Sequence, residues 1–585
     1  MSREPCSGRN RLGSVTRPQY LWGLGPVLLL LASSTFGSSA DCTEGDPQQN
    51  HNLTLGYAPA LPNFDFTAGL QRWGDDKDHL PQGQEKTVRK IYINTLPIFD
   101  TTATHESYWL YRWINSVHTF TRPRVIERLL LFSTGDPVNE RQLDESERLL
   151  RNESYIGDAE IRVVRDCQAS VDLEVVTREV WTLAPDISFK SSGGETSGHL
   201  GFRDSNFLGT GKSINLRFKQ DPDRNKLQLH YNDPNFQGKR VNIGAHVEKN
   251  SDGYDRLFDV GLPFYALDAR RSWGVSAADS KFAQYRYVDS IKTSGVQVQE
   301  TLIGVIWGFS EGLVGGQVNR YAFGAQSEKK AYGTLSNELA SAQVPGDLSL
   351  TYPFFEYQQV QDLYKIGFNI NQIRRSEDIH LGRDLRVRLG YSAEGQRVIL
   401  QGAWTDTWLA RNEMLLQSSL DWRGLWRVKE QAIEDGELNL RIKFHRGQTK
   451  NRSLVVGAEL SLLKNSLSQT ELTLGGDKGL RGYESNYQSG DTVFLVSAEE
   501  RVFTQYEPFD LFYIGYAAFV DVGRAWFRGQ KSANDNWQTD VGLGLRLLPS
   551  KSDRGQVVHL DLAFPLKSRN GDRRMLLSVE MKKTL

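Results

Sequence analysis

Alternation of apolar and polar residues with a period of two is the feature that most constrains this chain. It runs from Pro185 to the C-terminus at Leu585, and turn-rich polar stretches such as residues 221–225 separate the alternating segments. A strand that alternates in this way has one face in an apolar medium and the other face in a polar one. The pattern is plainest in four segments, at residues 241–247, 438–444, 541–547 and 558–564.

Two classes of β protein alternate like this, soluble sandwiches and membrane barrels. Arg, Lys, Glu and Asp occupy the inner face of many of these strands, which suits a hydrated lumen and not a dry core. A sheet can sit in lipid only when it is closed. We therefore predict a mainly β protein in which residues 184–585 form an antiparallel transmembrane β-barrel. At about 25 residues for each strand and its connection, about 16 strands are expected, an even number as in bacterial barrels.

The first 40 residues have the three parts of a secretory signal peptide. Four arginines lie before residue 18, an apolar run follows at residues 21–32, and small residues end at Ser38-Ser39-Ala40. The alternative is a membrane anchor, but the apolar run is shorter than the about 20 residues that a spanning helix needs. We expect cleavage after Ala40. Cys42 and Cys167 then remain, and the sequence leaves open whether they form a disulfide in an oxidising compartment.

Between the signal peptide and the barrel, the sequence predicts a tether and a small domain. Residues 41–86 are rich in Asp, Gln, Asn, Pro and Gly and indicate a flexible tether. Residues 87–183 predict one α+β domain with elements in the order β-α-α-β-β. Its strands are expected at residues 88–93, 159–164 and 171–176, and its helices at residues 122–132 and 139–150, with Leu143, Leu149 and Leu150 in the core.

This small domain resembles a POTRA domain. The resemblance rests on residues 134–164, where Gly-Asp-Pro separates the helices, a Leu-Leu pair ends the second helix, and Tyr-Ile leads into a strand. POTRA domains are periplasmic modules that receive unfolded outer-membrane or secreted chains. The resemblance therefore implies a single client-binding POTRA domain, and the alternative is an ordinary α+β module.

Several segments of the barrel region occur together in a family pattern. They are residues 204–209, residues 231–236, Leu480-Arg481-Gly482-Tyr483 in a Gly-rich segment, Phe519-Val520-Asp521-Val522-Gly523, and His559 to Leu566. Together they resemble the BamA/TpsB superfamily of outer-membrane barrels, the bacterial surface antigen family. The resemblance covers Val88 to Leu585.

In that family the Arg-Gly-aromatic motif lies at the tip of a loop that folds back into the lumen, where acidic residues of the wall bind the Arg. The alternation places Glu499 and Asp521 on the inner face of their strands. The resemblance therefore implies a lumen loop lock formed by Arg481, Gly482, Tyr483, Glu499 and Asp521. A guanidinium can bind a carboxylate through two hydrogen bonds, which sets geometry as well as charge. Gly482 is expected to let the loop turn tightly.

Two features depart from the family pattern. Family barrels usually end in an aromatic residue, whereas this chain ends Lys-Lys-Thr-Leu, after a last strand in which Met575, Leu577, Val579 and Met581 alternate outward. These four residues mark the predicted seam between the last and first strands. The second departure is the single POTRA domain, because related insertases carry several and secretion porters usually carry two.

Motifs for catalysis or metal binding lack the context that they need. Gly308-Phe309-Ser310-Glu311-Gly312 matches the nucleophile motif G-x-S-x-G, but a barrel strand is expected before it and a turn after it, not the required helix. The sequence has no H-E-x-x-H and no Cys-x-x-Cys. We therefore expect no enzyme activity, no cofactor and no metal. The net charge of −1 gives no basic field for nucleic acid.

The resemblance implies a factor that inserts proteins into, or exports them through, a bacterial outer membrane, with its POTRA domain in the periplasm. Its partners would be the lipid bilayer, unfolded outer-membrane or secreted client proteins, and periplasmic chaperones or accessory lipoproteins. A two-partner secretion porter is the alternative within this class, and a passive pore or uptake channel is the alternative of another class. The sequence does not identify the client.

Overall fold

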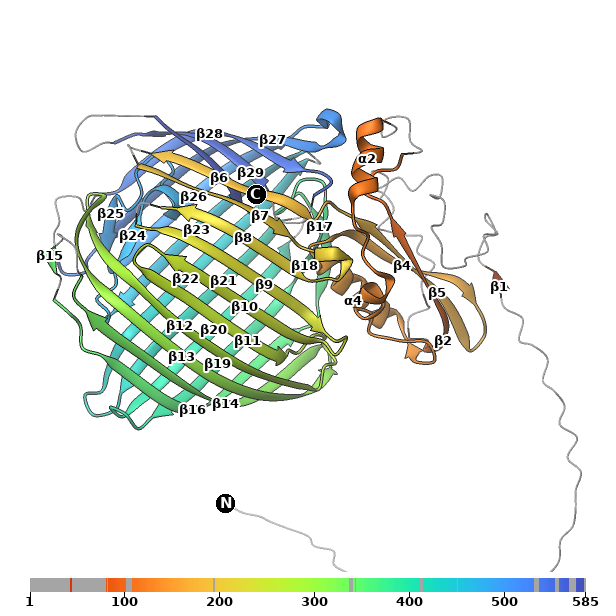
Figure 1. The fold of residues 1–585 in the computed structure, drawn as a ribbon, viewed down its shortest axis with the longest axis horizontal. Helices are drawn as coiled ribbons and strands as arrows, with labels where there is room; N and C mark the ends of the chain where they lie inside the picture. Colours follow the sequence, from red (N-terminus) through yellow and green to blue (C-terminus); the bar gives the residue numbers. More distant parts are fainter. Residues whose placement is uncertain are drawn as a thin grey trace, which may run out of the picture.

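The chain forms a large β-barrel with a small α+β domain at one end (Figure 1). In the computed structural model, the described residues are 43–44, 80, 83–101, 108–192, 195–221, 223–335, 340–341, 343–410, 414–449, 451–530, 536–552, 557–567 and 575–582. The predicted signal peptide and most of the predicted tether lie outside them. Within these ranges, no helix is long and apolar enough to cross a membrane.

The small domain is a five-stranded sheet with helices packed on it. The strand order is β1-β4-β5-β2-β3, in which β2 and β5 are parallel and the other neighbours are antiparallel. Its elements are β1 (Thr43–Glu44), β2 (Lys86–Leu96), α2 (Trp109–Val117), α3 (Pro123–Glu127), β3 (Pro137–Val138), α4 (Glu140–Asn152), β4 (Ile156–Asp166) and β5 (Ser170–Glu179).

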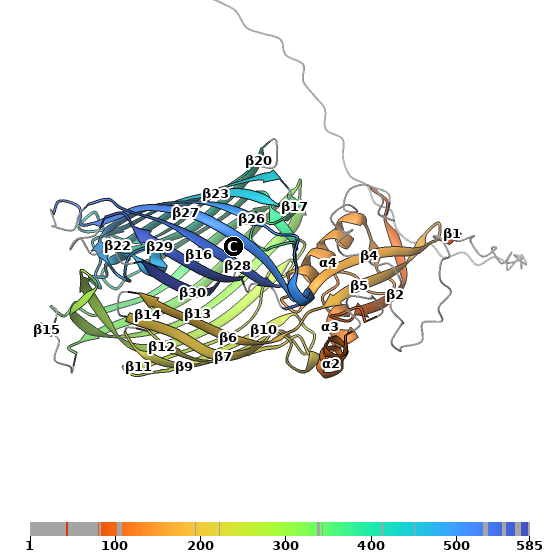
Figure 2. The ribbon, with the colours of Figure 1, turned by 90° about the horizontal axis from the view of Figure 1, so that it is seen from above.

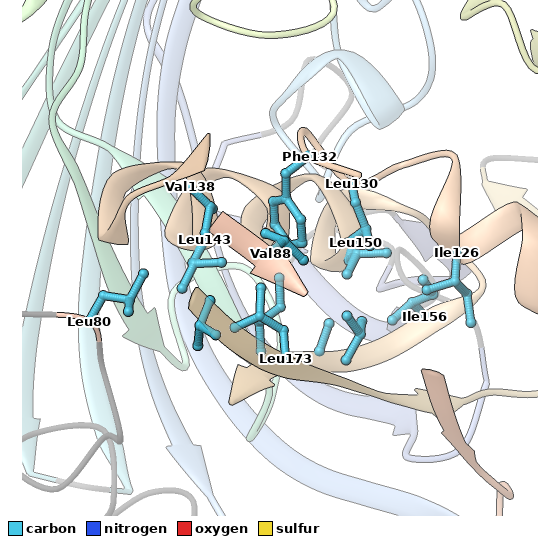
Figure 3. Packing of buried hydrophobic residues seen from close by; sticks show 14 of the residues in the cluster. Leu80, Val88, Ile126, Leu130, Phe132, Val138, Leu143, Leu150, Ile156 and Leu173 are labelled. Carbon is cyan, nitrogen blue, oxygen red and sulfur yellow. The ribbon is translucent and has the colours of Figure 1, made fainter. Parts of the chain in front are cut away.

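The core of this domain lies between the sheet and helices α3 and α4 (Figure 3). Leu143 and Leu150 of α4 face Val88, Val171 and Leu173 of the sheet and are buried, as the helical spacing predicts. Leu149, also expected in the core, is only partly buried and lies outside this cluster. Asn139 caps α4, because its side chain accepts a hydrogen bond from the Gln142 amide while the Gln142 side chain accepts one from the Asn139 amide. The first predicted helix is shorter than expected, since α3 ends at Glu127.

The barrel sheet joins each strand to its neighbours in chain order, and β30 closes on β6. Its strands are β6 (Leu183–Ser192), β7 (Glu195–Asp204), β8 (Ser213–Gln220), β9 (Asn225–Phe236), β10 (Val241–Asn250), β11 (Gly253–Leu262), β12 (Arg271–Val288), β13 (Ile291–Val314), β14 (Gln317–Gly333), β16 (Leu348–Gln361), β19 (Gly382–Ser392), β20 (Arg397–Ala410), β21 (Met414–Arg427), β22 (Ala432–Thr449), β23 (Arg452–Lys464), β26 (Thr492–Phe503), β27 (Phe512–Trp526), β28 (Gln538–Pro549), β29 (Val557–Pro565) and β30 (Leu576–Lys582), with the two-residue segment β15 (Ala340–Ser341) beside them.

The expectation of about 16 strands is wrong. In the described part of the chain the closed sheet has 21 segments, and setting β15 aside leaves about 20 barrel strands. The error arises from the connections, which were assumed to be longer than they are. Several are two-residue turns, such as Asp289-Ser290 between β12 and β13 and Gly315-Gly316 between β13 and β14. Short turns leave room for more strands in the same length of chain.

The alternation itself is confirmed on the barrel wall. Along β27, Tyr516 and Val520 are exposed on the outside, whereas Phe519 and Asp521 are buried on the inside. Leu543 on β28 is 63% exposed, which places an apolar side chain of the predicted outer face on the outer surface. The barrel therefore has an apolar outer surface and an inner surface rich in ion pairs.

The small domain sits across one end of the barrel (Figure 2), and charged residues of α4 make part of the contact. Glu145 accepts a hydrogen bond from the Leu267 amide of the β11–β12 turn at 2.7 Å, and Arg141 pairs with Asp268 of the same turn. Glu145 is nearly fully buried as a result.

Two barrel turns hold the small domain. The first lies in the family segment at residues 204–209, and the second follows the segment at residues 231–236, which is the end of β9. Asn206, in the β7–β8 turn, donates its side-chain amide to Thr121 Oγ1 at 2.8 Å. Arg240, which follows the second segment, donates to the Leu130 carbonyl at 2.5 Å. Cys167, at the end of β4, is disulfide-bonded. Cys42 lies outside the described residues.

Candidate functional site

A loop between β23 and β26 carries the Arg-Gly-Tyr motif. It contains the short hairpin of β24 (Leu472–Leu474) and β25 (Gln488–Gly490), which does not join the barrel sheet, and the 3₁₀ turn η4 (Gly476–Lys478). Gly475 and Gly479 have φ of 121° and 102°, a backbone region that residues with a side chain rarely adopt. These two glycines therefore allow the backbone conformation of the loop that precedes Arg481.

Arg481 binds three acidic residues on three different strands. Its Nε and Nη2 donate to Asp521 Oδ2 and Oδ1 of β27 at 2.8 and 3.0 Å. Its Nη1 donates to Glu499 Oε2 of β26 at 2.8 Å and lies 3.5 Å from Asp561 Oδ2 of β29. The side chain of Asp521 is 2% exposed, so this two-bond contact is shielded from water.

The aromatic ring of Phe519 lies under the guanidinium. The Arg481 Cζ atom is 3.4 Å from the centroid of this ring, and Phe519 is buried two residues before Asp521 on the same face of β27. A guanidinium stacks favourably on such a ring while its edges bind carboxylates. Ser497 Oγ is a further acceptor for Arg481 Nη2, at 3.3 Å.

Two more arginines extend the cluster along the inner wall. Arg546 of β28 donates to Asp561 Oδ1 at 2.5 Å and to Glu499 Oε2 at 3.1 Å, and its side chain is fully buried. Arg501 of β26 donates to Glu499 Oε1 at 2.9 Å. Each of the three arginines of this group thus has a carboxylate partner, as burial of a charge in a low dielectric requires.

Gly482 and Tyr483 carry the contact further along the wall. A Cβ atom on Gly482 would lie 2.6 Å from Asp540 Cβ and 3.1 Å from the Pro565 amide nitrogen, so no side chain fits there. Gly482 lies in a tight turn, as expected, in which the Tyr483 amide donates to the Leu480 carbonyl at 3.0 Å, and the close approach to Asp540 is a second reason for a glycine there. The Tyr483 hydroxyl lies 3.0 Å from the Thr539 carbonyl oxygen and 2.9 Å from that of Lys567, and it can donate to either.

The structure brings together all five residues of the predicted loop lock, and it adds some that the sequence interpretation missed. The additions are Phe519, Arg501, Arg546, Asp540 and Asp561. Alternation already placed Arg546 and Asp561 on the inner face of their strands. A charged side chain that points inward was thus the sequence feature that could have identified them. Their position along the barrel axis was not available, because it depends on the register between strands. That these contacts lock the loop remains a prediction.

The predicted seam lies where β30 meets β6. Among the described residues this pairing has three residue pairs, Leu577↔Ser191, Ser578↔Lys190 and Val579↔Phe189, whereas β29 and β30 form seven and β6 and β7 form ten. Leu577 is exposed on the outer surface, and Val579 and Met581 follow it at every second position of β30. Met575 is also exposed but precedes the strand. Among the wall strands of the described part of the chain, this pairing has the fewest residue pairs.

A second hairpin that is not part of the barrel wall lies between β16 and β19, and the sequence interpretation missed it. It consists of β17 (Tyr364–Phe368) and β18 (Ser376–His380) and lies where the small domain meets the barrel (Figure 2). Arg375, beside β18, donates to the carbonyls of Pro549, Ser550 and Ser552 at 2.7–3.0 Å. The sequence interpretation missed this hairpin because the alternation in its strands resembles that of a wall strand.

This hairpin contacts both the small domain and the inner cluster. Arg151 of α4 donates Nε and Nη2 to the two carboxylate oxygens of Asp378 at 2.9 and 2.8 Å. At the other side of the hairpin, Arg501 Nη1 lies 3.4 Å from the Ile370 carbonyl oxygen. A continuous set of polar contacts therefore runs from α4 through the hairpin to Glu499 and Arg481.

Ser310, the residue of the G-x-S-x-G match, lies within β13. Its hydroxyl donates to the Asn319 carbonyl of β14 at 2.8 Å and accepts from the Gly312 amide at 3.0 Å. Residues 291–333, which hold the motif, form two strands and a two-residue turn, without the helix that a nucleophile elbow needs. Ser310 thus stabilises a bulge in the ladder.

Comparison with known proteins gives one family match and several distant structural neighbours. The family model of the Omp85 superfamily domain matches residues 206–578. Solved structures to which this chain is similar include BamA from Haemophilus ducreyi lacking POTRA domains 1–3, at 11% identity and a TM-score of 0.39, with 86% of this chain and 85% of that chain covered.

Two further solved structures are CdiB proteins. CdiB from Acinetobacter baumannii has 13% identity and a TM-score of 0.42, with 86% of this chain and 74% of that chain covered. CdiB from Escherichia coli has 11% identity and a TM-score of 0.35, with 85% and 90% covered. No curated protein matches the sequence. The family match, which spans the barrel from the β7–β8 turn into β30, is the comparison that carries weight.

Proposed function

The chain belongs to the Omp85 superfamily, and from this premise we propose that it inserts client proteins into an outer membrane or exports them through it. In this proposal the barrel spans the outer membrane, and the small domain is a POTRA domain on the periplasmic side that receives extended clients. The work is transfer of a polypeptide, so no catalytic residue, cofactor or metal takes part. The partners are the bilayer and unfolded client chains, with periplasmic chaperones or lipoproteins as accessory factors.

The observation that carries this proposal is the contrast between the braced wall and the weak seam beside it. Arg481 joins β26, β27 and β29 through buried ion pairs, and the Tyr483 hydroxyl contacts the carbonyls of Thr539 in β28 and of Lys567 just after β29. The next pairing after β29–β30 is the seam, with three residue pairs among the described residues. A barrel built in this way can separate β30 from β6 while its C-terminal wall keeps its shape.

The small domain offers a sheet edge for an extended client. Strand β4 has 11 residues, but β1, its neighbour on the outer side, pairs with only Asp166 and Arg165. Among the described residues, no strand other than β1 pairs with β4 on this side of the sheet, and addition of a strand at a sheet edge is a common way to bind an extended peptide. This supports a receiving role for the domain.

The inserts inside the barrel argue against a passive pore. An open channel has no need for a loop that buries Arg481 against the wall, nor for the β17–β18 hairpin at the end that faces the small domain. Both inserts reduce the open cross-section of the lumen. In a secretion porter, the predicted tether at residues 41–86 would narrow the lumen further. A large rise in conductance on deletion of this tether would support the secretion-porter alternative.

The direct experiment is a disulfide across the seam. Cysteines at Val579 and Phe189, which are register partners, should form a bridge between β30 and β6. Oxidation is expected to stop client insertion or export, and reduction should restore it. The control pair is Leu229 and Val247, register partners on β9 and β10 whose side chains are both exposed on the outside. If the seam bridge leaves activity as high as the control bridge does, the seam is not the exit.

Depletion of the protein from its host would then separate insertion from export. A fall in the amounts of other outer-membrane proteins indicates insertion, and loss of one secreted protein with normal outer-membrane proteins indicates export. If both stay normal, the proposal is wrong.

A further inference from the structure

Helix α2 presents an uncovered aromatic face. Trp109 is 71% exposed and Trp113 is 54% exposed, and Leu110 and Val117 lie on the same side of the helix at helical spacing. Tyr108, directly before the helix, is 65% exposed. Two exposed tryptophans on one helix face are unusual for a surface that meets only water, and such patches mark interaction sites.

The opposite face of α2 is firmly packed, so the aromatic face is held in place. The ring of Tyr111 stacks on that of Phe99 with the centroids 4.5 Å apart. Asn115 exchanges two hydrogen bonds with the backbone of Phe99, at 2.8 and 3.2 Å. Ile114 packs on the same buried cluster, together with Trp181 and Leu511.

The helix is attached to the rim of the barrel. The Tyr111 hydroxyl donates to the carbonyl of Phe509, in the turn between β26 and β27, at 2.5 Å. In that turn Phe509 is 78% exposed and Tyr506 is 70% exposed. We call Tyr108, Trp109, Trp113, Tyr506 and Phe509 the rim aromatic patch.

The patch continues the apolar outer surface of the barrel. Strand β27 begins directly after the turn, and Phe512, Tyr516 and Val520 follow one another on its outer face, all exposed. In Figure 1, α2 lies beside the end of β27 and runs across the long axis of the molecule, and Figure 2 shows it at the same edge. The helix is therefore placed where the surface of a membrane around the barrel would meet the small domain.

We propose that α2 is an interfacial helix whose aromatic face enters the headgroup region of the lipid bilayer around the barrel. This rests on the proposed function in one respect, that the barrel spans a membrane. Tryptophan and tyrosine favour this depth because their rings are apolar and carry one polar group. A short helix with one apolar face and a charged flank lies flat at such a boundary, and exposed Arg112 supplies a cation that can reach lipid phosphates.

The α2 helix is also connected to the strands next to the seam. Trp181, which packs against the α2 cluster, donates its backbone amide to the Lys551 carbonyl of the β28–β29 turn at 2.6 Å. A bilayer contact through α2 therefore holds the small domain beside the strands that lead to β30. A client bound to the domain would be presented at the membrane surface near the seam.

The test is fluorescence quenching of the full-length protein in vesicles of phosphatidylcholine and phosphatidylglycerol. The lipids carry bromine near the headgroup end of one acyl chain, and matched vesicles carry none. The difference in emission between the wild type and the Trp109→Leu/Trp113→Leu variant reports the two α2 tryptophans. Leucine keeps the face apolar, so the helix stays in place. A matched Trp273→Leu/Trp307→Leu variant reports two exposed tryptophans that pair across β12 and β13 on the outer wall.

If α2 is interfacial, bromine quenches the α2 pair by a fraction comparable to that of the outer-wall pair. Quenching of the outer-wall pair alone overturns the proposal and leaves the membrane barrel intact, and it would assign the patch to a protein partner. Quenching of neither pair overturns the membrane barrel itself, and the interfacial helix with it. In a second measurement, Trp109→Glu/Trp113→Glu should slow client insertion, whereas Trp109→Leu/Trp113→Leu, which keeps the face apolar, should slow it less.

Discussion

Arg481 and Asp521 are joined by two parallel hydrogen bonds, from Nε to Oδ2 at 2.8 Å and from Nη2 to Oδ1 at 3.0 Å. One residue belongs to a loop inside the lumen and the other to the barrel wall. The guanidinium also reaches Glu499 and lies near Asp561. The loop therefore ties three strands to one another, next to the place where the barrel is least well closed.

Replacement of Arg481 by Ala should destabilise the barrel strongly. The change leaves buried carboxylates without their cation, which costs about 3–5 kcal/mol for a buried pair. Lysine keeps the charge but cannot form both bonds to Asp521, so Arg481→Lys should lie between the wild type and Arg481→Ala. The measurement is the urea midpoint for loss of the compact, heat-modifiable form on a gel.

Arg441→Ala is the matched control for this series. Arg441 pairs with Asp421, but both side chains are more than 40% exposed. An exposed pair contributes about 0–1 kcal/mol. Equal shifts in the two alanine variants would mean that the inner cluster does not stabilise the barrel.

Gly482→Ala should displace the loop although alanine is a small residue. The added methyl group would lie 2.6 Å from Asp540 Cβ, and either the loop or β28 must move. Such overpacking lowers the free energy of unfolding by about 1–3 kcal/mol. The measurement is again the urea midpoint of the compact form. Gly457→Ala on β23 is the control, since no atom lies within 4 Å of its Cβ position. An unchanged urea midpoint for Gly482→Ala would contradict the close contact.

Asp378→Asn should loosen the small domain from the barrel. Arg151, whose side chain is 3% exposed, would lose a charged two-bond partner and keep Glu147 and the Ala159 carbonyl. The free energy that holds the small domain to the barrel should fall by about 1–3 kcal/mol through the loss of this contact. Hydrogen exchange should rise in α4 and in the β17–β18 hairpin together. Glu160→Gln is the control, because its pair with Arg162 is about a third exposed and should matter little.

The stability of α4 should fall between about pH 4.5 and pH 7. Burial raises the pKa of the Glu153 carboxyl, at the C-terminal end of this helix, from 4.5 to about 7. In that window the folded domain holds a proton that the unfolded chain has released, so stability decreases as the pH rises and is lowest above about pH 7. This pKa shift corresponds to a decrease of roughly 3 kcal/mol in the free energy of unfolding across the window.

Hydrogen exchange of the α4 amides at pH 5 and pH 8, compared with that of Glu153→Gln, measures this effect. Glutamine is neutral throughout, so the variant should be the more protected at pH 8 and should match the wild type at pH 5. Glu127→Gln, at an exposed position on α3, should follow the wild type. A constant difference between the wild type and Glu153→Gln at the two pH values would falsify the prediction.

The sequence alone determined the class of the fold and the direction in which many side chains point. Alternation is a local property of a strand, so the inward position of Glu499 and Asp521 follows from their neighbours in the chain. The core of the small domain follows in the same way from the spacing of Leu143 and Leu150 along a helix. The family resemblance drawn from the barrel motifs is confirmed by the match over residues 206–578.

Only the tertiary structure decided what these side chains meet. Asp561 and Arg546 join Arg481 because strand register brings them to the same level of the barrel, and register is a relation between strands. Glu145 and Arg151 occupy a charged helix face that is buried, because the barrel supplies Leu267 and Asp378 as partners. The number of strands, the β17–β18 hairpin and the place of α2 at the rim likewise depend on how distant segments pack, which no local pattern contains.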